Sequence, residues 1–419
     1  MAYSNQSRPS GRTSKPYGQR QSGGFQGGRS GGRSGGFSGG GQRSSRGPKR
    51  QNINPAMFIN KQTKEQQQEA YVPKNLFTDF GFTDALQRNI DYVSPSAIQD
   101  QTIPLAMEGK DVIGLANTGT GKTAAFLLPI LNRLFETRQT GSVLIIAPTR
   151  ELAQQIDAEF RKFSTDMKLY SAICVGGVNI GSQIRMIQRR PHVIIGTPGR
   201  LKDLMKQGIL HIDNVDTFVL DEADRMLDMG FVADIKDIAS HLPVDRQTLC
   251  FSATMSDGVR KLASEFMRDP TMVSVKVSET SDHIYQDVVG YNDEDHKKDL
   301  LLEMLQQEGF EKVIVFGETK FGVQRLADKL EKDGVSSQAI HGNKSQGQRN
   351  RALQAFKSNN SRVLVATDVA ARGLDIPNVS HVINFDLPQT YDDYVHRIGR
   401  TGRGGSHGTA LTFVKNSRY

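Results

Sequence analysis

The sequence predicts an α/β protein with two tandem parallel-sheet units behind a disordered N-terminal segment. Three observations support this fold class. Short β-branched runs alternate with helical patterns, the alternation starts again near residue 283, and the first 50 residues contain few apolar side chains. Strand–helix alternation is typical of a parallel sheet that is covered by helices on both faces. At about 150 residues per domain, a chain of 419 residues accommodates two to three domains.

The N-terminal segment, residues 1–50, contains ten Lys and Arg side chains and no Asp or Glu. Because the whole chain carries only +8, the remainder is slightly acidic. The segment is rich in Gly and Ser and has too few apolar residues to offset the entropy of ordering, so it is expected to be disordered. Three interpretations stay open: an RNA-binding arm, a solubilising tail, and an organelle transit peptide, which the glycine density opposes. Residues 51–73 are expected to be a polar linker, with a helix over 62–70.

The first α/β unit is expected over residues 74–277, and the second over residues 283–419. Strands are predicted in the first unit at Asp111–Leu115, Val143–Ala147, Ser171–Val175, Val193–Gly196, Thr217–Leu220 and Thr248–Ser252. In the second unit they are predicted at Lys312–Phe316, Gln338–His341, Val363–Ala366, His381–Phe385 and Thr409–Phe413. Helices are predicted at Arg150–Phe163, Phe321–Glu331 and Gln346–Phe356. Residues 269–282 are interpreted as the connection between the two units.

Composition excludes several classes of protein. The two cysteines, Cys174 and Cys250, cannot form a disulfide framework or a zinc cluster, which fits a reducing compartment such as the cytoplasm. The longest apolar runs are far shorter than the ~18 residues that span a bilayer. Because no hydrophobic signal core follows Met1, secretion is not expected.

A phosphate-binding loop is predicted at the start of the first unit, where a strand is followed by Gly-rich residues and a helix. Its residues are Ala116, Asn117, Thr118, Gly119, Thr120, Gly121, Lys122 and Thr123. The glycines allow backbone N–H groups to approach phosphate oxygens, Lys122 would contact the β- and γ-phosphates, and Thr123 would ligate Mg²⁺. The alternative, a Gly-rich turn before a helix, is opposed by the strand–loop–helix context.

Acidic residues follow the apolar strand Phe218–Leu220, about 100 residues after the loop. In a P-loop ATPase the second magnesium-binding group lies at the carboxyl end of such a strand. Asp221 would therefore bind the metal, and Glu222 would orient or deprotonate the attacking water. Taken alone, these acids would more often be a solvated helix start.

Three arginines cluster in the second unit, within the segment His396–Arg403. Such a surface cluster is usually solvated or salt-bridged. Phosphoryl transfer, however, requires cations against the transition-state charge. Arginines supplied by a second domain would make hydrolysis depend on closure of the cleft between the units.

The order of these motifs resembles the DEAD-box RNA helicase family over residues 77–415. The matching stretches in the first unit are Pro95–Gln99, Ala116–Thr123, Pro148–Ala153, Gly176–Gly177, Thr197–Arg200, Asp221–Asp224 and Ser252–Thr254. In the second unit they are His341–Gly342 with Gln346 and Arg349, Ala366–Asp368 with Ala371–Asp375, and His396–Arg403. The resemblance implies two RecA-like domains that bind ATP with Mg²⁺ and grip RNA.

The resemblance also implies a role for each matching residue. Gln99 would read adenine, Phe77 would stack on it, and Asp375 would contact the ribose. Arg400 and Arg403 would be the arginine fingers, and Ser252 and Thr254 would couple hydrolysis to strand separation. The RNA backbone would be gripped by Arg150, Gly177, Thr197, Arg200, Gly342, Thr367 and Arg372. Contacts of this kind fix position without reading sequence.

The sequence departs from the family pattern at three places that bear on these implied roles. Asn117 replaces the usual Gln. The span before Gln99 is short, which leaves Phe77, Phe80 and Phe82 as alternatives for the stacking ring. The chain ends at Tyr419, where the family usually continues into a further helix, so the second domain would lack a packing element or borrow one from a partner.

The sequence thus predicts a cytoplasmic, ATP-dependent RNA helicase with a monomeric core, which remodels RNA and ribonucleoprotein partners without contacting a membrane. Two alternatives stay open. One is a non-catalytic clamp that ATP locks onto RNA, and the other is a P-loop ATPase that acts on DNA. Neither the RNA nor the pathway follows from the sequence.

Overall fold

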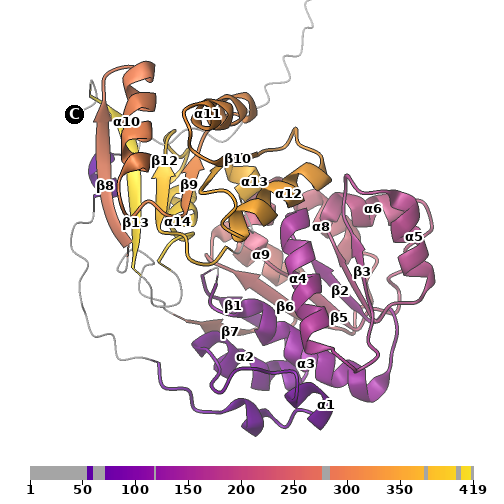
Figure 1. Cartoon of the computed structure of the whole chain (residues 1–419). Helices are drawn as coiled ribbons and strands as arrows, with labels where there is room; N and C mark the ends of the chain where they lie inside the picture. Colours follow the sequence, from indigo (N-terminus) through magenta and orange to yellow (C-terminus); the bar gives the residue numbers. More distant parts are fainter. Residues whose placement is uncertain are drawn as a thin grey trace, which may run out of the picture. The chain divides into compact units, whose positions relative to one another are not determined.

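The computed structural model of the protein describes residues 54–59, 71–117, 119–275, 284–371, 376–402 and 407–416. The N-terminal segment 1–50 and the helix predicted over residues 62–70 lie outside them. Two parallel β-sheets organise the described residues, one within residues 71–275 (the first domain) and one within residues 284–416 (the second domain) (Figure 1).

The first sheet has seven strands, all parallel, in the order β3-β4-β2-β5-β6-β1-β7. Their bounds are β1 Val112–Leu115, β2 Val143–Ile146, β3 Ser171–Cys174, β4 Val193–Gly196, β5 Thr217–Leu220, β6 Gln247–Ser252 and β7 Thr271–Ser274. The six predicted strands are confirmed to within one residue at each end. β7 corrects the sequence prediction, which placed these residues in the connection between the units. Only Val273 of this edge strand is buried, so the sequence shows no continuous apolar run there.

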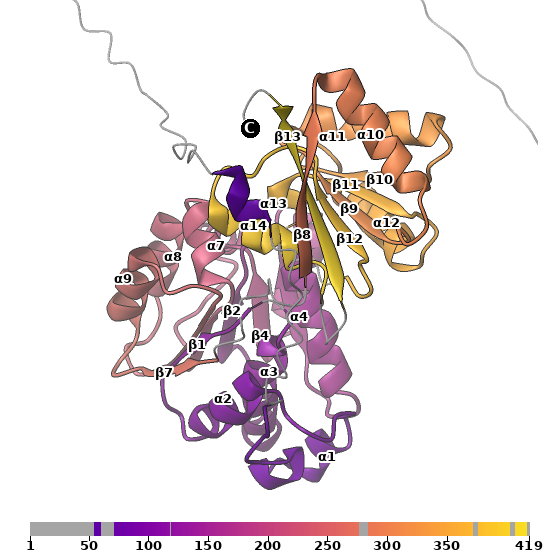
Figure 2. The same ribbon diagram turned by 90° about the vertical axis from the view of Figure 1, so that its left-hand side faces the viewer.

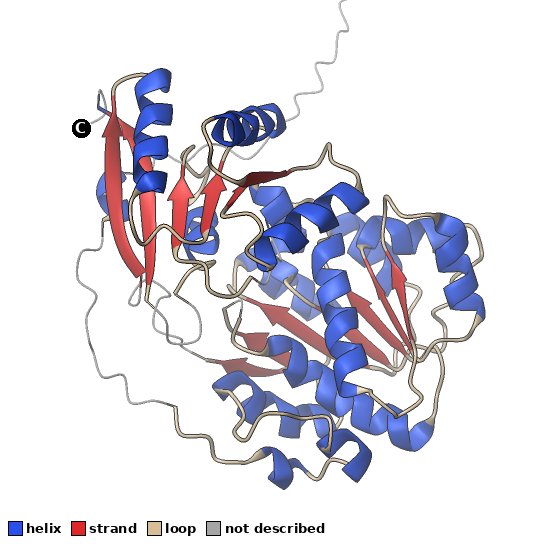
Figure 3. Cartoon of the chain, in the orientation of Figure 1, coloured by secondary structure: helices blue, strands red, loops and turns tan. Residues whose placement is uncertain are grey.

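Helices cover both faces of the first sheet (Figure 3). Its helical elements are η2 Phe77–Phe80, α1 Asp84–Gln87, α2 Ala97–Met107, α3 Lys122–Thr137, α4 Arg150–Phe163, α5 Ile180–Gln188, α6 Pro198–Lys206, α7 Ala223–Asp228, α8 Val232–Ala239 and α9 Asp257–Phe266. In β2, Val143 and Ile145 join one apolar cluster, whereas Leu144 and Ile146 join the other. This alternation follows from the two-residue period of a strand, and burial on both sides explains its wholly apolar sequence.

The second sheet has six parallel strands in the order β10-β11-β9-β12-β13-β8. Their bounds are β8 Ile284–Tyr291, β9 Val313–Phe316, β10 Ser337–Ile340, β11 Val363–Ala366, β12 His381–Asn384 and β13 Gly408–Lys415. The helices are α10 Glu294–Gln306, α11 Lys320–Lys332, α12 Gln346–Lys357, α13 Asp368–Ala371 and α14 Tyr391–Ile398. The five predicted strands are confirmed, but β8 was missed because its polar Gln286 and Asp287 interrupt the apolar pattern of an edge strand.

A short 3₁₀ helix, η1 Pro55–Phe58, precedes the first domain in sequence and contacts β8 of the second domain. Figure 2 shows this indigo segment beside α14. Phe58 is 1% exposed and belongs to an apolar cluster with residues of β8, β13 and α14. Part of the segment interpreted as a polar linker is therefore packed. Among the described residues, every helix is too short or too polar to cross a membrane.

Candidate nucleotide and nucleic-acid site

The strand order sorts the predicted site residues along the carboxyl edge of the first sheet. The loops after β5, β6 and β1, which are neighbours, carry Asp221, Thr254 and Lys122. The loops after β3, β4 and β2, which are also neighbours, carry Gly177, Thr197 and Arg150. One half of the edge therefore collects the predicted nucleotide residues, and the other half collects the predicted RNA residues. Ligands of open α/β sheets bind at this edge.

The predicted phosphate loop connects β1 to the start of α3, as the sequence requires. Gly119 and Gly121 have φ of 87° and 92°, a backbone conformation that strains other residues. Lys122 is buried, and its Nζ donates to the carbonyl of Ala116 at 2.9 Å across the loop. The Thr120 hydroxyl donates to the carbonyl of Asn117 at 2.8 Å. Thr118 lies outside the described residues.

The start of α2 is tied to the phosphate loop. Ser96 Oγ donates to the carbonyl of Thr120 at 2.8 Å, and Gln99 Nε2 donates to the carbonyl of Gly121 at 3.1 Å. Gln99 Oε1 also accepts from the Ser96 N–H at 2.8 Å. An amide group has a second N–H and a second lone pair, so the predicted reading of adenine remains compatible with these bonds. A Cβ at position 121 would lie 2.3 Å from Gln99 Nε2, so a larger residue there would have to displace the Gln99 amide as well as adopt a strained φ.

The three candidate stacking aromatics differ in burial. Phe77 is 1% exposed and lies in the core of the first domain, with its ring centroid 5.9 Å from that of Phe80. Phe82 is also buried, whereas Phe80 is half-buried. The assignment of Phe77 as the stacking residue stays a prediction.

Asp221 and Glu222 lie buried where β5 meets α7. Glu222 has a left-handed backbone with φ of 54°, which turns the chain sharply at the end of the strand. The Glu222 N–H donates to Asp221 Oδ1 at 2.9 Å, and Glu222 Oε2 pairs with Arg225 Nη1 at 2.8 Å. Burial raises the pKa of Asp221 above its ordinary value, although the nearby Lys122 charge opposes this shift. A cation at this carboxylate would remove the cost of ionising it.

These residues fit a magnesium ion that is bound together with a nucleotide. Mg²⁺ typically takes one or two protein oxygens and completes its shell with phosphates and water. Asp221, which follows β5, and the half-buried Thr123, in the first turn of α3, can each offer an oxygen ligand at the carboxyl edge of the first sheet. The described residues contain no cluster of three His, Cys, Asp or Glu side chains that could hold a metal alone.

Asp224 joins the acidic motif to the segment Ser252–Thr254. Its Oδ2 accepts from the N–H groups of Ala253 and Thr254, each at 3.0 Å, and from the Thr254 hydroxyl at 3.3 Å. Burial would raise the pKa of Asp224, but the charges of Lys122, His396 and Arg225 outweigh it and lower the pKa. No separate role for Asp224 is predictable from the sequence. Its contact with Thr254 joins residues 30 positions apart, and such a contact leaves no pattern among neighbouring residues.

The predicted RNA residues of the first domain are placed by backbone packing. The Arg150 guanidinium lies against Gly177, where a Cβ would be 2.1 Å from Arg150 Nη1. Thr197 precedes α6, and its N–H donates to the carbonyl of Cys174 at 3.0 Å. Arg200 Nε lies 3.7 Å from Asp203, and its Nη1 is buried without a hydrogen-bond partner among the described residues. These polar groups converge beside the ends of β3 and β4.

In the second domain, two predicted RNA residues follow neighbouring strands. Gly342 follows β10, and Thr367 follows the neighbouring β11, where its carbonyl accepts from the N–H groups of Ala370 and Ala371, the last two residues of α13. No atom would contact a Cβ at Gly342, so this glycine leaves an open approach. Arg372 and Asp375 lie outside the described residues, and so does Arg403.

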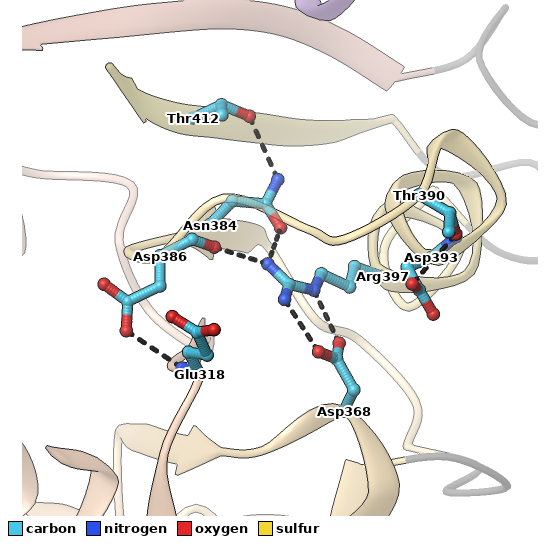
Figure 4. A network of polar contacts seen from close by, with 8 residues as sticks. All are labelled: Glu318, Asp368, Asn384, Asp386, Thr390, Asp393, Arg397 and Thr412. Carbon is cyan, nitrogen blue, oxygen red and sulfur yellow. Dashed lines mark hydrogen bonds and ion pairs between the residues drawn. The ribbon is translucent and has the colours of Figure 1, made fainter. Parts of the chain in front are cut away.

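Arg397 organises the arginine-bearing helix α14 (Figure 4). It forms a two-bond ion pair with Asp368 at 2.6 and 2.8 Å, and it donates to Asn384 Oδ1 and the Asp386 carbonyl. Arg397 is 2% exposed, so this arginine of the predicted cluster is a structural residue. Arg400, the predicted finger, is also buried at 3% exposure.

Glu151 of α4 contacts two residues of α12. Its Oε1 accepts from Gln346 Nε2 at 3.1 Å, and its Oε2 pairs with Arg349 Nη2 at 2.9 Å. Gln346 Oε1 in turn accepts from Arg150 Nη1 at 3.4 Å. Glu151, Gln346 and Arg349 belong to motifs that resemble the family, but the sequence predicts no role for them. Here they link the RNA-side loop of the first domain to the second domain.

The fold and the site together define a protein with two parallel-sheet domains, the first of which carries a phosphate-binding loop between β1 and α3. Residues 96–262 match the family described as DEAD/DEAH box helicase, and residues 296–405 match the helicase conserved C-terminal domain. The DEAD-box ATP-dependent RNA helicase CshA of Geobacillus kaustophilus is 46% identical over 341 residues, which span 81% of this chain and 73% of that relative. The chain therefore belongs to the DEAD-box family of ATP-dependent RNA helicases.

Other similar proteins agree with this assignment. The ATP-dependent RNA helicase CshA of Listeria monocytogenes is 44% identical over 342 residues, which span 81% of this chain and 66% of that relative. Dbp5 of S. cerevisiae, solved bound to RNA and ADP–BeF3, has a TM-score of 0.73 and 33% identity, covering 82% of this chain and 90% of that one. Mss116p bound to ssRNA and AMP-PNP has a TM-score of 0.71 and 31% identity, covering 79% of this chain and 72% of that one.

Proposed function

We propose that the chain uses ATP hydrolysis to unwind or remodel RNA duplexes and RNA–protein complexes locally. The observation that carries this proposal is the joint placement of Lys122, Asp221 and Glu222 at the ends of β1 and β5. Asp224 there connects them to Ser252–Thr254 through three hydrogen bonds. A change at the γ-phosphate would thus be transmitted to the loop after β6 by a buried carboxylate.

The nucleotide half of the first domain supplies the chemistry. Lys122 would neutralise the β- and γ-phosphates, and Thr123 and Asp221 would hold Mg²⁺, which neutralises the developing charge when bound. Glu222 would position or deprotonate the attacking water. Its ion pair with Arg225 fixes the carboxylate in one orientation before the nucleotide binds. Gln99 would read adenine, and Asp375 would contact the ribose.

The RNA half would grip the backbone of one strand. Arg150, Gly177, Thr197 and Arg200 would act from the first domain, and Gly342, Thr367 and Arg372 from the second. Glycines allow the backbone to approach phosphates closely, and the arginines supply charge-assisted bonds. Contacts limited to phosphate and sugar carry no base information, so the protein would bind RNA largely irrespective of sequence.

Arg400 and Arg403 would stabilise the transition state from the second domain. Hydrolysis would then require both domains around the same nucleotide, which makes ATP turnover depend on RNA binding. We further propose a monomeric core in the cytoplasm that meets ribonucleoprotein partners. The buried, unpaired thiols of Cys174 and Cys250 support a reducing compartment.

The variant Glu222→Gln tests the proposed chemistry. The amide oxygen that this substitution introduces can still accept from Arg225, so the fold and nucleotide binding should persist while RNA-stimulated ATP turnover falls by about 10²–10⁴-fold. Single-turnover hydrolysis and fluorescent-nucleotide binding measure the two properties, with the exposed Glu303→Gln as the matched control. Wild-type turnover in Glu222→Gln would contradict the assignment, and so would loss of nucleotide binding.

A further inference from the structure

The ring of Phe58 occupies an apolar socket on the second domain, although its segment precedes the first domain in sequence. The buried residues of the socket are Ile284 of β8, Tyr394 and Ile398 of α14, and Ala410 of β13. The ring centroids of Phe58 and Tyr394 lie 4.7 Å apart. Phe58 is 1% exposed, whereas its neighbours Met57 and Ile59 are 48% and 39% exposed. Phe58 is therefore the most deeply buried side chain of residues 54–59.

The segment is shaped locally for this contact. Asn54 caps the turn by accepting from the Ala56 N–H at 3.0 Å, and Pro55 occupies the first position of the 3₁₀ helix. Proline presets the backbone angle φ that this position needs. The Met57 N–H donates to the Asn54 carbonyl at 3.0 Å. These constraints reduce the entropy that is lost when Phe58 docks.

Part of the socket lies on α14, the helix that ends two residues before the predicted finger Arg400. Tyr394 is fully buried, and its hydroxyl donates to Gln286 Oε1 at 2.8 Å, which holds α14 against β8. Three residues further along α14, Arg397 pairs with Asp368. Phe58 and Asp368 thus contact the same helix through different side chains, and docking of Phe58 adds to the support of α14.

The docked residues 54–59 lie close in sequence to the arginine-rich segment. The last cation of the arginine-rich segment, Arg50, lies four residues before Asn54. On the other side, eleven residues separate Ile59 from Tyr71. A connection of this length reaches at most ~40 Å. In sequence, the docked residues 54–59 therefore lie between the arginine-rich segment and the first domain.

We propose that residues 54–59 are an intramolecular anchor that fixes the origin of the arginine-rich segment on the second domain. The partner that this arrangement suits is a single-stranded region of RNA adjoining the strand held between Gly342 and Thr367. This part rests on the proposed RNA-binding function. Without the anchor, the nearest fixed point for the same ten cations would be Tyr71, and the tether between them and that point would be about 17 residues longer. A longer tether lowers the effective concentration of the cations at the RNA.

Hydrogen exchange in the full-length protein tests the anchor without RNA. Phe58→Ala should raise amide exchange in α14 and β8, because loss of a buried phenyl ring shifts a docking equilibrium by roughly 10- to 100-fold. The exposed Met57→Ala is the matched control, and Phe58→Leu should restore most of the protection. Exchange that rises equally in β9 and β11 would indicate unfolding of the domain and contradict docking. Unchanged exchange in α14 and β8 would contradict it too.

A double-mutant cycle tests the effect on RNA. In the full chain, Phe58→Ala should weaken binding of single-stranded RNA by about three- to tenfold with an unchanged salt slope, because the number of cations stays the same. In a chain lacking residues 1–50, the same substitution should have no effect on RNA affinity. Equal effects of Phe58→Ala in both backgrounds would overturn the positioning role. If removal of residues 1–50 leaves RNA affinity unchanged, the proposed RNA-binding arm fails, while the exchange result still decides whether the anchor exists.

Discussion

Several site residues act through contacts with the chain's own backbone. Two features favour glycine at position 121. Its φ lies in the left-handed region, and a Cβ there would lie close to the Gln99 side-chain amide. Asp224 is held ionised by the charges around it and accepts three bonds from one loop. Positions like these tolerate little substitution, because a buried carboxylate without its partners costs far more than one hydrogen bond.

The pKa of His381 makes the stability of the second domain depend on pH. Burial lowers this pKa to about 4 from an ordinary 6.5, and the ring stacks on Phe310 with centroids 3.9 Å apart. The unfolded chain therefore binds a proton that the folded chain excludes at intermediate pH. The contribution of the neutral His381 ring to the free energy of unfolding should be complete above about pH 6.5. It should decrease as the pH falls towards 4. Urea unfolding of His381→Phe, which keeps an aromatic ring, should show a shallower decrease than the wild type.

The exposed His211→Gln serves as the control for that comparison and should behave like the wild type. Equal pH dependence in His381→Phe and the wild type would show that other groups account for the loss of stability.

At the scale of elements, the two sheets use their edges alike. In each, the predicted site residues lie in segments that follow the strands, because parallel strands place all their carboxyl ends on one side. The helix α14 is held by bonds from Arg397 to Asn384 of β12 and Asp368 of α13, so its position depends on residues outside its own sequence.

Arg397→Ala should destabilise the second domain by about 3 kcal/mol, because it leaves Asp368 and the side-chain oxygen of Asn384 without their shared partner. The melting temperature of that domain measures the effect, and the exposed Arg351→Ala is the control. A loss below about 0.5 kcal/mol, the usual range for surface substitutions, would show that the ion pair is dispensable.

At the scale of the whole molecule, catalysis is expected to need both domains. A protein limited to residues 71–277 retains Lys122, Asp221 and Glu222 together with both apolar clusters of the first sheet. It should therefore bind ATP but hydrolyse it at least ~10³-fold more slowly than the full chain, since the arginine fingers are absent. Arg400→Ala in the full chain should show a loss in the same direction. RNA-stimulated turnover by the first domain alone at the full rate would remove the second domain from the chemistry.

Removal of residues 1–50 should weaken RNA binding mainly at low salt. Each phosphate neutralised on a single strand contributes ~0.7 to the salt slope, so engagement of about half the cations predicts a slope flatter by roughly 3–4 units. Affinity measured across a salt series tests this, and saturating RNA should restore nearly full ATPase activity. An unchanged slope would assign the segment to solubility or assembly.

The sequence by itself determined most of the strands, three of the helices, and the positions of the Gly-rich loop before α3 and of the acid after β5. These are local features: apolar periodicity, glycines before a helix, and a carboxylate directly after an apolar run each lie within a few residues. The same locality explains the failures. β7 and β8 are edge strands with one buried face or interrupting polar residues, so their periodicity is weak.

Only the tertiary structure decided which loops meet. The order β3-β4-β2-β5-β6-β1-β7 separates the loops with predicted nucleotide residues from the loops with predicted RNA residues, and no periodicity along the chain encodes which strands pair. The bonds from Ala253 and Thr254 to Asp224 and the docking of Phe58 on Tyr394 likewise join residues 29, 30 and 336 positions apart. Such contacts form because folding buries apolar surface and satisfies buried polar groups across the whole molecule. Their partners are therefore chosen by the packed structure and not by neighbouring residues.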